Sequence, residues 1–335
     1  MINPATIYRR GENRTNILGT VVLVATLLLI VLFAVKIDGF ATLGNLRVIV
    51  SNSASLVILS CGMAVVIISR GLDLSLIAQM VAGAATFSIL INAGLNGLTA
   101  FALTMSAMVL IGLLNALLIA YAEIPAMLAT LASAMAITGF FRFAILRGEY
   151  LLLLDKSNPA VALLSSNLLP GISVPLLLMA SILIVTWGLL HYSVPGRITY
   201  AMGDNFQAAR LTGLPVRTTT LAVYVFAAFT AFIAGLVVSS ASGTVDFRTV
   251  TNGSLLFDVI LVVVLGGIPL RGGRGGVGNI LVGVALIAVL RNGMTLLDFS
   301  TQIQDVLKGL VLITAIVADR FINPRDMETD TVGDL

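Results

Sequence analysis

Long apolar runs separated by short polar segments dominate this chain. Stretches without any charged residue at 15–35, 48–69, 157–196 and 218–245 each reach the roughly 20 residues that a helix needs to cross a bilayer. The charge-free stretch 74–122 is long enough for two crossings, and the turn-like segment Asn92–Gly97 divides it. The pattern therefore predicts a protein that is integral to a membrane.

We predict an all-α integral membrane protein with about ten transmembrane helices. The eighth and ninth spans are short for a complete crossing. The tenth contains Asp305 and Lys308, which lie three residues apart on a helix and could pair. The expected spans are 17–35, 51–69, 74–92, 98–120, 125–146, 173–192, 220–240, 256–269, 277–293 and 303–321.

Basic residues are distributed unequally between the loops. With the amino end inside, Arg9, Arg10, Arg14, Arg70, Arg197, Arg210, Arg217, Arg271, Arg274, Arg320 and Arg325 fall on the cytoplasmic side, against Lys36, Arg47, Arg147, Lys156 and Arg248 outside. Because cytoplasmic loops carry the excess of Lys and Arg, we expect both termini in the cytoplasm. The predicted organisation is a cytoplasmic segment at 1–16, a transmembrane domain at 17–321 and an acidic cytoplasmic tail at 322–335.

Composition supports this class and excludes others. Hydrophobic residues make up 58% of the chain and charged residues only 10%, whereas soluble domains carry about 25% charged residues. The single cysteine, Cys61, allows neither an intramolecular disulfide nor a cysteine metal cluster. The arginines are scattered over loops without an aromatic platform, which argues against nucleic acid as a partner.

One polar segment, 201–217, stands out between the apolar spans. Gly203 and Asp204 with Asn205 are typical of a turn and helix start, residues 206–211 fit about two helical turns, and Gly213 followed by a proline ends the helix. A short, tightly terminated helix on the aqueous face of a membrane protein indicates contact with a soluble partner. Within the loop 193–219, the candidate contact residues are Gly203, Asn205, Ala208, Ala209, Arg210, Leu211 and Gly213.

The chain carries no pattern for covalent chemistry. Gly272–Gly278 is rich in glycine but lacks the Lys-Ser/Thr of a phosphate-binding loop, so we interpret it as a tight cytoplasmic turn. We find no plausible Ser/His/Asp site and no His/Glu metal pattern. The sequence therefore predicts no catalytic residue, no metal site, no bound cofactor and no ATP hydrolysis by this chain itself.

Several polar residues fall within or beside the spans. A buried amide in lipid requires a partner, and acids at span edges favour helix-start roles over ion coupling. Close packing of helices is the better explanation for most of the small polar residues. The candidates for a pathway or gate are Asn52, Asp73, Ser75, Asn115, Thr130, Asp258 and Asn292.

Six motifs in order resemble the inner-membrane permease subunits of bacterial ABC importers of the ribose, xylose, galactose and arabinose type. The motifs are Ser69–Ser75, Asn115 with Ile124–Leu131, Gly203–Gly213, Asp258 with Val264–Gly267 and Gly272–Gly275, Asn292–Leu297, and Ala315 with Asp319. The chain departs from the family pattern at Arg70, at Leu76 and Ile77, at Leu256 and at Ile268 and Pro269.

The resemblance implies a permease that works with other chains. ATPase subunits, which hold the ATP and magnesium, dock beneath it on the helix at 205–212. A periplasmic binding protein delivers a small neutral polyol such as a monosaccharide. A second permease subunit, either a copy of this chain or a paralogue, completes the path in the bacterial inner membrane.

Three alternatives remain at the level of sequence. A permease for another polar metabolite, such as a nucleoside or a branched-chain amino acid, belongs to the same class, although a zwitterion site would need paired charges facing the path. An ion-coupled secondary transporter would need acids at mid-membrane, which are scarce here. A structural membrane subunit would leave solute uptake unchanged when the chain is lost.

Overall fold

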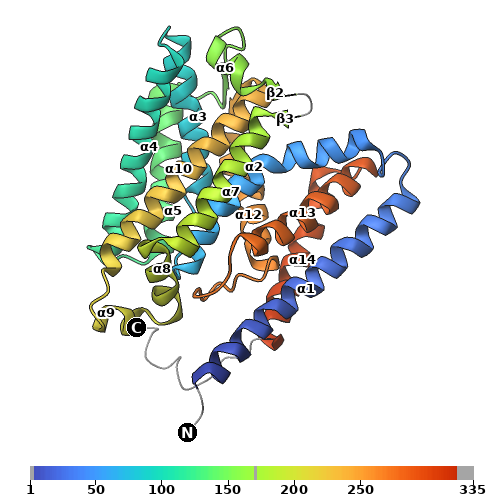
Figure 1. Cartoon of the computed structure of the whole chain (residues 1–335). Coiled ribbons are helices and arrows are strands. Elements are labelled where there is room, and N and C mark those ends of the chain that lie inside the picture. Colours follow the sequence, from blue (N-terminus) through green and yellow to red (C-terminus); the bar gives the residue numbers. More distant parts are fainter. Residues whose placement is uncertain (1–3, 170–171, 323–335) are drawn as a thin grey trace.

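The computed structural model describes residues 4–169 and 172–322, and these residues are mostly helical (Figure 1). The long helices are α1 (Pro4–Lys36), α2 (Leu43–Ile68), α3 (Leu76–Asn92), α4 (Gly97–Ala120), α5 (Ala126–Phe140, continued by the π-helical turn η1, Phe141–Ile145), α7 (Val174–Tyr192), α10 (Val216–Ser242), α12 (Ser254–Leu265), α13 (Val277–Leu296) and α14 (Thr301–Ile322). The short helices are α6 (Pro159–Leu164), α8 (Val194–Asp204), α9 (Phe206–Leu211) and α11 (Arg248–Asn252).

The helices match the predicted spans. Within the described residues, seven are long and apolar enough to cross a membrane (α1, α2, α4, α5 with η1, α7, α10 and α13), and α3 and α12 are shorter apolar helices. The largest differences lie at two amino ends, because α2 begins at Leu43 rather than at 51 and α1 begins at Pro4, inside the predicted cytoplasmic segment. Beyond Ile322, the predicted acidic tail lies outside the described residues.

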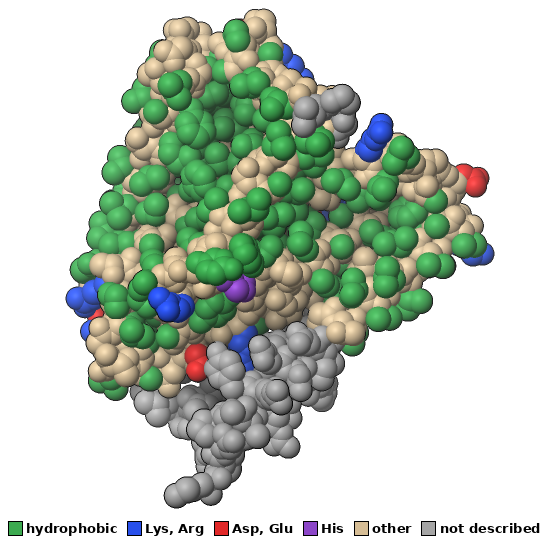
Figure 2. Space-filling view, viewed as in Figure 1, with side chains coloured by type: hydrophobic (Ala, Val, Ile, Leu, Met, Phe, Trp, Pro, Cys, Tyr) green, Lys and Arg blue, Asp and Glu red, His purple; other side chains and the backbone are tan. Residues whose placement is uncertain are grey.

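Helices α2 and α10 form the centre of the molecule. In their most apolar stretches, 78% and 72% of residues are buried, against 17% in α1 and in α7. Helix α10 packs against α2, α3 and α4 (Figure 1), and large apolar side chains remain exposed on the outer helices. Figure 2 shows such side chains over much of one face, with charged side chains mainly near its edges. An apolar outer face is what contact with lipid requires.

Two small two-stranded antiparallel sheets depart from the purely helical prediction. Strand β1 (Leu151–Leu153) pairs with β4 (Thr244–Asp246), and β2 (Asn167–Leu169) pairs with β3 (Ile172–Ser173). Helix α6 with β2 and β3 lies at the end of the molecule opposite to α9 (Figure 1). The two ends of the molecule therefore differ in structure. One end carries α6 with short strands, and the opposite end is formed by the helices α8 and α9.

Candidate functional site

The predicted contact segment folds as two helices joined by one residue. Asn205 ends α8, and its side chain accepts a hydrogen bond from the backbone N–H of Ala208 at 2.9 Å, which caps the start of α9. The helix start at Asn205 is therefore confirmed. Gly203 and Asp204, however, are not a turn, because they form the last residues of α8.

Gly213 ends the short helix as its sequence context predicts. Its φ is +78°, in the left-handed region that favours glycine. Its N–H donates to the carbonyl of Arg210 at 3.1 Å, and the N–H of Leu214 donates to the carbonyl of Ala209 at 3.2 Å. These bonds satisfy carbonyls that would otherwise be unpaired at the helix end. The chain then turns into α10 within a few residues.

The two alanines of α9 face opposite ways. Ala209 is 4% exposed and lies in an apolar cluster with Ile198, Met202 and Val216. Ala208 is exposed, and Leu211 is 86% exposed. The two alanines, both predicted to contact a partner, therefore do not share one face. Ala209 fixes α9 to α8 and α10, whereas the free face consists of Gln207, Ala208 and Leu211.

A glutamate that the sequence did not single out bridges α9 and α10. Glu123 Oε1 lies 3.4 Å from Nη2 of Arg210 and 3.5 Å from Nη2 of Arg217, and the Arg217 guanidinium lies 5.2 Å from the ring centre of Tyr121. These groups border a groove of about 270 Å³ between the end of α4, α9 and the start of α10. Because the charged side chains are about half exposed, the pairs orient α9 more than they stabilise the fold.

Gly203 is a site of direct backbone contact between three segments. A Cβ on this residue would lie 1.9 Å from the carbonyl oxygen of Ile68, at the end of α2, and 2.2 Å from the nitrogen of Gly273. The Gly273 N–H donates to that same Ile68 carbonyl at 2.9 Å, and the Tyr200 hydroxyl donates to the carbonyl of Gly275 at 2.7 Å. The last turn of α8 therefore touches α2 and the loop 270–276 with no side chain between them.

Asp73 and Ser75 form a buried polar network between α2 and α3. The Asp73 carboxylate accepts from the backbone N–H and hydroxyl of Ser75, and Gln79 Nε2 donates to the Ser75 hydroxyl at 2.7 Å. Burial raises the pKa of the Asp73 carboxyl to about 6, and the hydrogen bonds from Ser75 and Gln79 oppose that rise. Asp73 thus holds the start of α3, as expected for an acid at this position, but from inside the protein.

Asn115 and Thr130 join this network from neighbouring helices. Asn115 Nδ2, on α4, donates to the Ser75 hydroxyl at 2.9 Å. The Thr130 hydroxyl, on α5, accepts from the N–H of Leu74 at 3.1 Å. Four of the seven predicted pathway residues are therefore brought together, and all four are buried. In this conformation they bond the α2–α3 connection to α4 and α5 rather than line an open cavity.

The other three predicted pathway residues lie apart. Asn52 is exposed on α2. Asn292, on α13, exchanges two amide hydrogen bonds of 2.9 Å with Asn45 at the start of α2, so its position is explained by helix packing. Asp258, on α12, forms an ion pair of 2.8 Å with Lys308 of α14 instead of a simple helix cap. The predicted pairing of Asp305 with Lys308 is confirmed at 2.9 Å.

Comparison with known proteins decides the family. Residues 45–316 match the family described as "Branched-chain amino acid transport system / permease component". The chain belongs to this family. No solved structure matches it. Together with the ribose and arabinose permeases described next, this match confirms the resemblance seen in the sequence motifs, and the permease is a multi-pass protein of the inner membrane.

Characterised relatives cover most of the chain. The ribose import permease protein RbsC of Escherichia coli (strain K12) is 28% identical over 89% of the permease and 92% of its own length. RbsC of Bacillus subtilis (strain 168) is 31% identical over 78% and 80%. The L-arabinose transport system permease protein AraH of Escherichia coli (strain K12) is 30% identical over 89% of each chain. The similarity thus includes both the buried network and the α8–α9 unit.

Proposed function

We propose that the permease is the transmembrane subunit of an ATP-driven importer for a monosaccharide or a related polyol. The names of its relatives support this class of solute, because they are ribose and arabinose permeases. The structure of α9 supports the proposal that import is driven by ATP. This helix is capped at its start, ends at a glycine and exposes on its free face a leucine, Leu211, that is 86% accessible. Such a face outside the apolar spans fits a groove on a soluble ATPase subunit.

In the proposed mechanism, α8 and α9 move together as a rigid body. An ATPase subunit that binds one position of α9 more tightly than another shifts the balance between two packings of the permease. Ala209 and Glu123 keep α9 attached to α8, α10 and the end of α4. Because Gly203 contacts the end of α2 directly, a movement of α8 would also move that end. The segment with Asp73 and Ser75 follows α2, and its hydrogen bonds connect it to α4 and α5.

The partners follow from the same proposal. ATP and magnesium belong to the ATPase subunits, so the permease needs no cofactor and performs no covalent chemistry. A periplasmic binding protein delivers the solute to the end with α6, β2 and β3. A second permease subunit, a copy or a paralogue, completes the path.

Uptake by intact cells tests the proposed solute. Deleting the gene for the permease should abolish uptake of at least one labelled sugar from a panel of ribose, arabinose, xylose and galactose, and a plasmid copy should restore it. Leucine uptake should not change. Loss of leucine uptake alone would assign the permease to the solute in the family description, and unchanged uptake of every solute would favour a structural subunit.

We further propose ten crossings with both termini in the cytoplasm. Helices α3, α12 and α14 would add to the seven long apolar helices, and the loop arginines would then lie inside. In cells that express the permease without its ATPase subunits, a cysteine in place of the exposed Gln207 should resist an impermeant thiol reagent while the cells are intact and react after permeabilisation. The parent protein supplies the background, since Cys61 is buried. Labelling of position 207 from outside would contradict the topology.

A further inference from the structure

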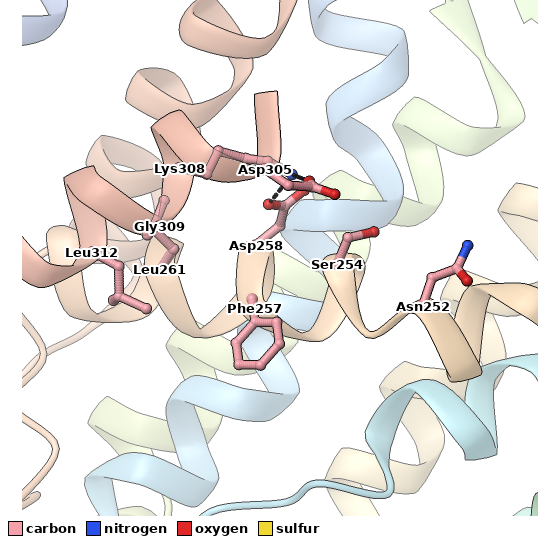
Figure 3. A pocket seen from close by; sticks show the side chains of 9 residues that line it. All are labelled: Asn252, Ser254, Phe257, Asp258, Leu261, Asp305, Lys308, Gly309 and Leu312. Carbon is pink, nitrogen blue, oxygen red and sulfur yellow. Dashed lines mark ion pairs between the residues drawn. The ribbon is translucent and has the colours of Figure 1, made fainter. Parts of the chain in front are cut away.

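A pocket of about 220 Å³ lies between the start of α12 and α14 (Figure 3). It is separate from the α8–α9 unit and from the network around Asp73. Its lining combines hydrogen-bonding side chains with one aromatic ring and includes Asn252, Ser254, Phe257, Asp258, Asp305 and Lys308. Phe257 is 58% exposed. Neither family membership nor the ATPase contact accounts for this combination.

Three charges meet at the wall of the pocket. Lys308 Nζ lies 2.8 Å from Asp258 Oδ1 and 2.9 Å from Asp305 Oδ1 (Figure 3). The side chains of Lys308 and Asp258 are only 13% and 8% exposed. Ionisable residues within transmembrane segments are costly and usually functional. Here one ammonium group is shared by two carboxylates, and donors and acceptors remain at the wall of a cavity.

We propose that this pocket binds one neutral polyol on its way through the permease, an inference that rests on the proposed function. A sugar hydroxyl both donates and accepts hydrogen bonds, so it suits carboxylates beside an ammonium group, with Asn252 and Ser254 at the rim. The ring of Phe257 offers an apolar surface to the C–H face of a sugar. Charge-assisted hydrogen bonds to such hydroxyls are about twice as strong as neutral ones.

The same geometry disfavours a zwitterion. The Lys308 ammonium already contacts two carboxylates, so an amino acid would have to displace an ion pair to match its own charges. The volume is also below the roughly 300–1,000 Å³ of pockets for drug-sized ligands, which fits a single small solute. The pocket therefore favours a monosaccharide over the amino acids in the family description.

Protection of an introduced cysteine tests the pocket directly. In the assembled importer in lipid nanodiscs, ribose, with arabinose, xylose and galactose in parallel, should slow maleimide labelling of a Ser254→Cys variant. A Thr301→Cys variant, on the exposed start of α14 and outside the pocket lining, is the matched control and should label at an unchanged rate. Leucine should protect neither position. Protection by leucine and by no sugar would overturn the proposal.

A second variant separates binding from a purely structural ion pair. Lys308→Met removes the ammonium, and we expect the sugar concentration for half-protection of Ser254→Cys to rise about tenfold, as for the loss of one charge-assisted hydrogen bond. An unchanged half-protection concentration would assign the pair to helix packing alone. If no sugar protects Ser254→Cys although the same complex imports one, the pocket proposal fails while the proposed function stands. If the complex imports no sugar, the proposed function fails as well.

Discussion

Replacing Gly203 with valine should abolish ATP-driven uptake while the permease remains in the membrane. The first carbon of the new side chain would lie 1.9 Å from the Ile68 carbonyl and 2.2 Å from the Gly273 nitrogen. Both neighbours are backbone atoms, so no side chain can rotate away, and α8 must separate from α2. Gly203 lies outside the apolar spans, so insertion should be unaffected. Labelled-sugar uptake, normalised to the amount of permease in the membrane, measures the effect.

The matched control is Gly188→Val. Gly188 lies in α7, also within a helix, and a Cβ there would meet nothing within 4 Å. This variant should keep most of its uptake. Normal uptake by the Gly203→Val permease would contradict the contact between α8 and α2 as the route of transmission. Equal loss of uptake in both variants would show that added volume in any helix is harmful. The contact between Gly203 and the end of α2 would then have no special role in transport.

Replacing Leu211 with glutamate should weaken docking of the ATPase subunit. The side chain is 86% exposed on the free face of α9, so the change places a charge at the proposed contact without disturbing the packing of the permease. Loss of an anchor residue at the centre of an interface costs about 2 kcal/mol, which corresponds to a roughly thirtyfold loss of affinity. The measurement is the amount of ATPase that co-purifies with the permease.

Leu168→Glu is the control for this experiment. Leu168 is also an exposed leucine, at 58%, but it lies in β2 at the opposite end of the molecule. Its variant should retain the ATPase at the normal ratio. Ala209→Glu is a poor test, because Ala209 is buried and the charge would disrupt the cluster that holds α9 in place. Full retention of the ATPase by Leu211→Glu would exclude the exposed face of α9 as a major contact.

Local sequence patterns predicted the positions of the helices and the two ends of α9. Runs without charge located the spans because a membrane helix must be apolar along its whole length. The short helix α9 was predicted from Asn205 and Gly213, whose roles depend on neighbouring residues only. The Asn205 side chain accepts a hydrogen bond from the N–H three residues ahead, and Gly213 adopts a positive φ. These features are encoded within a few positions, so a single sequence contains them.

Features that join distant segments could not be predicted in the same way. Gln79 was missed because its role is to donate a hydrogen bond to the Ser75 hydroxyl, which also accepts one from Asn115 on another helix. Glu123 was missed because its two arginine partners follow about ninety positions later in the chain. Gly203 was assigned to a turn, since a glycine beside Asp-Asn favours one. Only the three-dimensional arrangement shows that it is required for contact with Ile68.

The most direct test of the account is solute uptake by proteoliposomes that contain the permease, its ATPase and the binding protein. With ATP on the side of the ATPase, a labelled sugar from the panel should accumulate, and an uncoupler should leave the rate unchanged. Omitting ATP, or replacing the permease with the Leu211→Glu variant, should reduce the rate to background. Uptake that continues without ATP but collapses with the uncoupler would contradict an ATP-driven importer and identify an ion-coupled transporter.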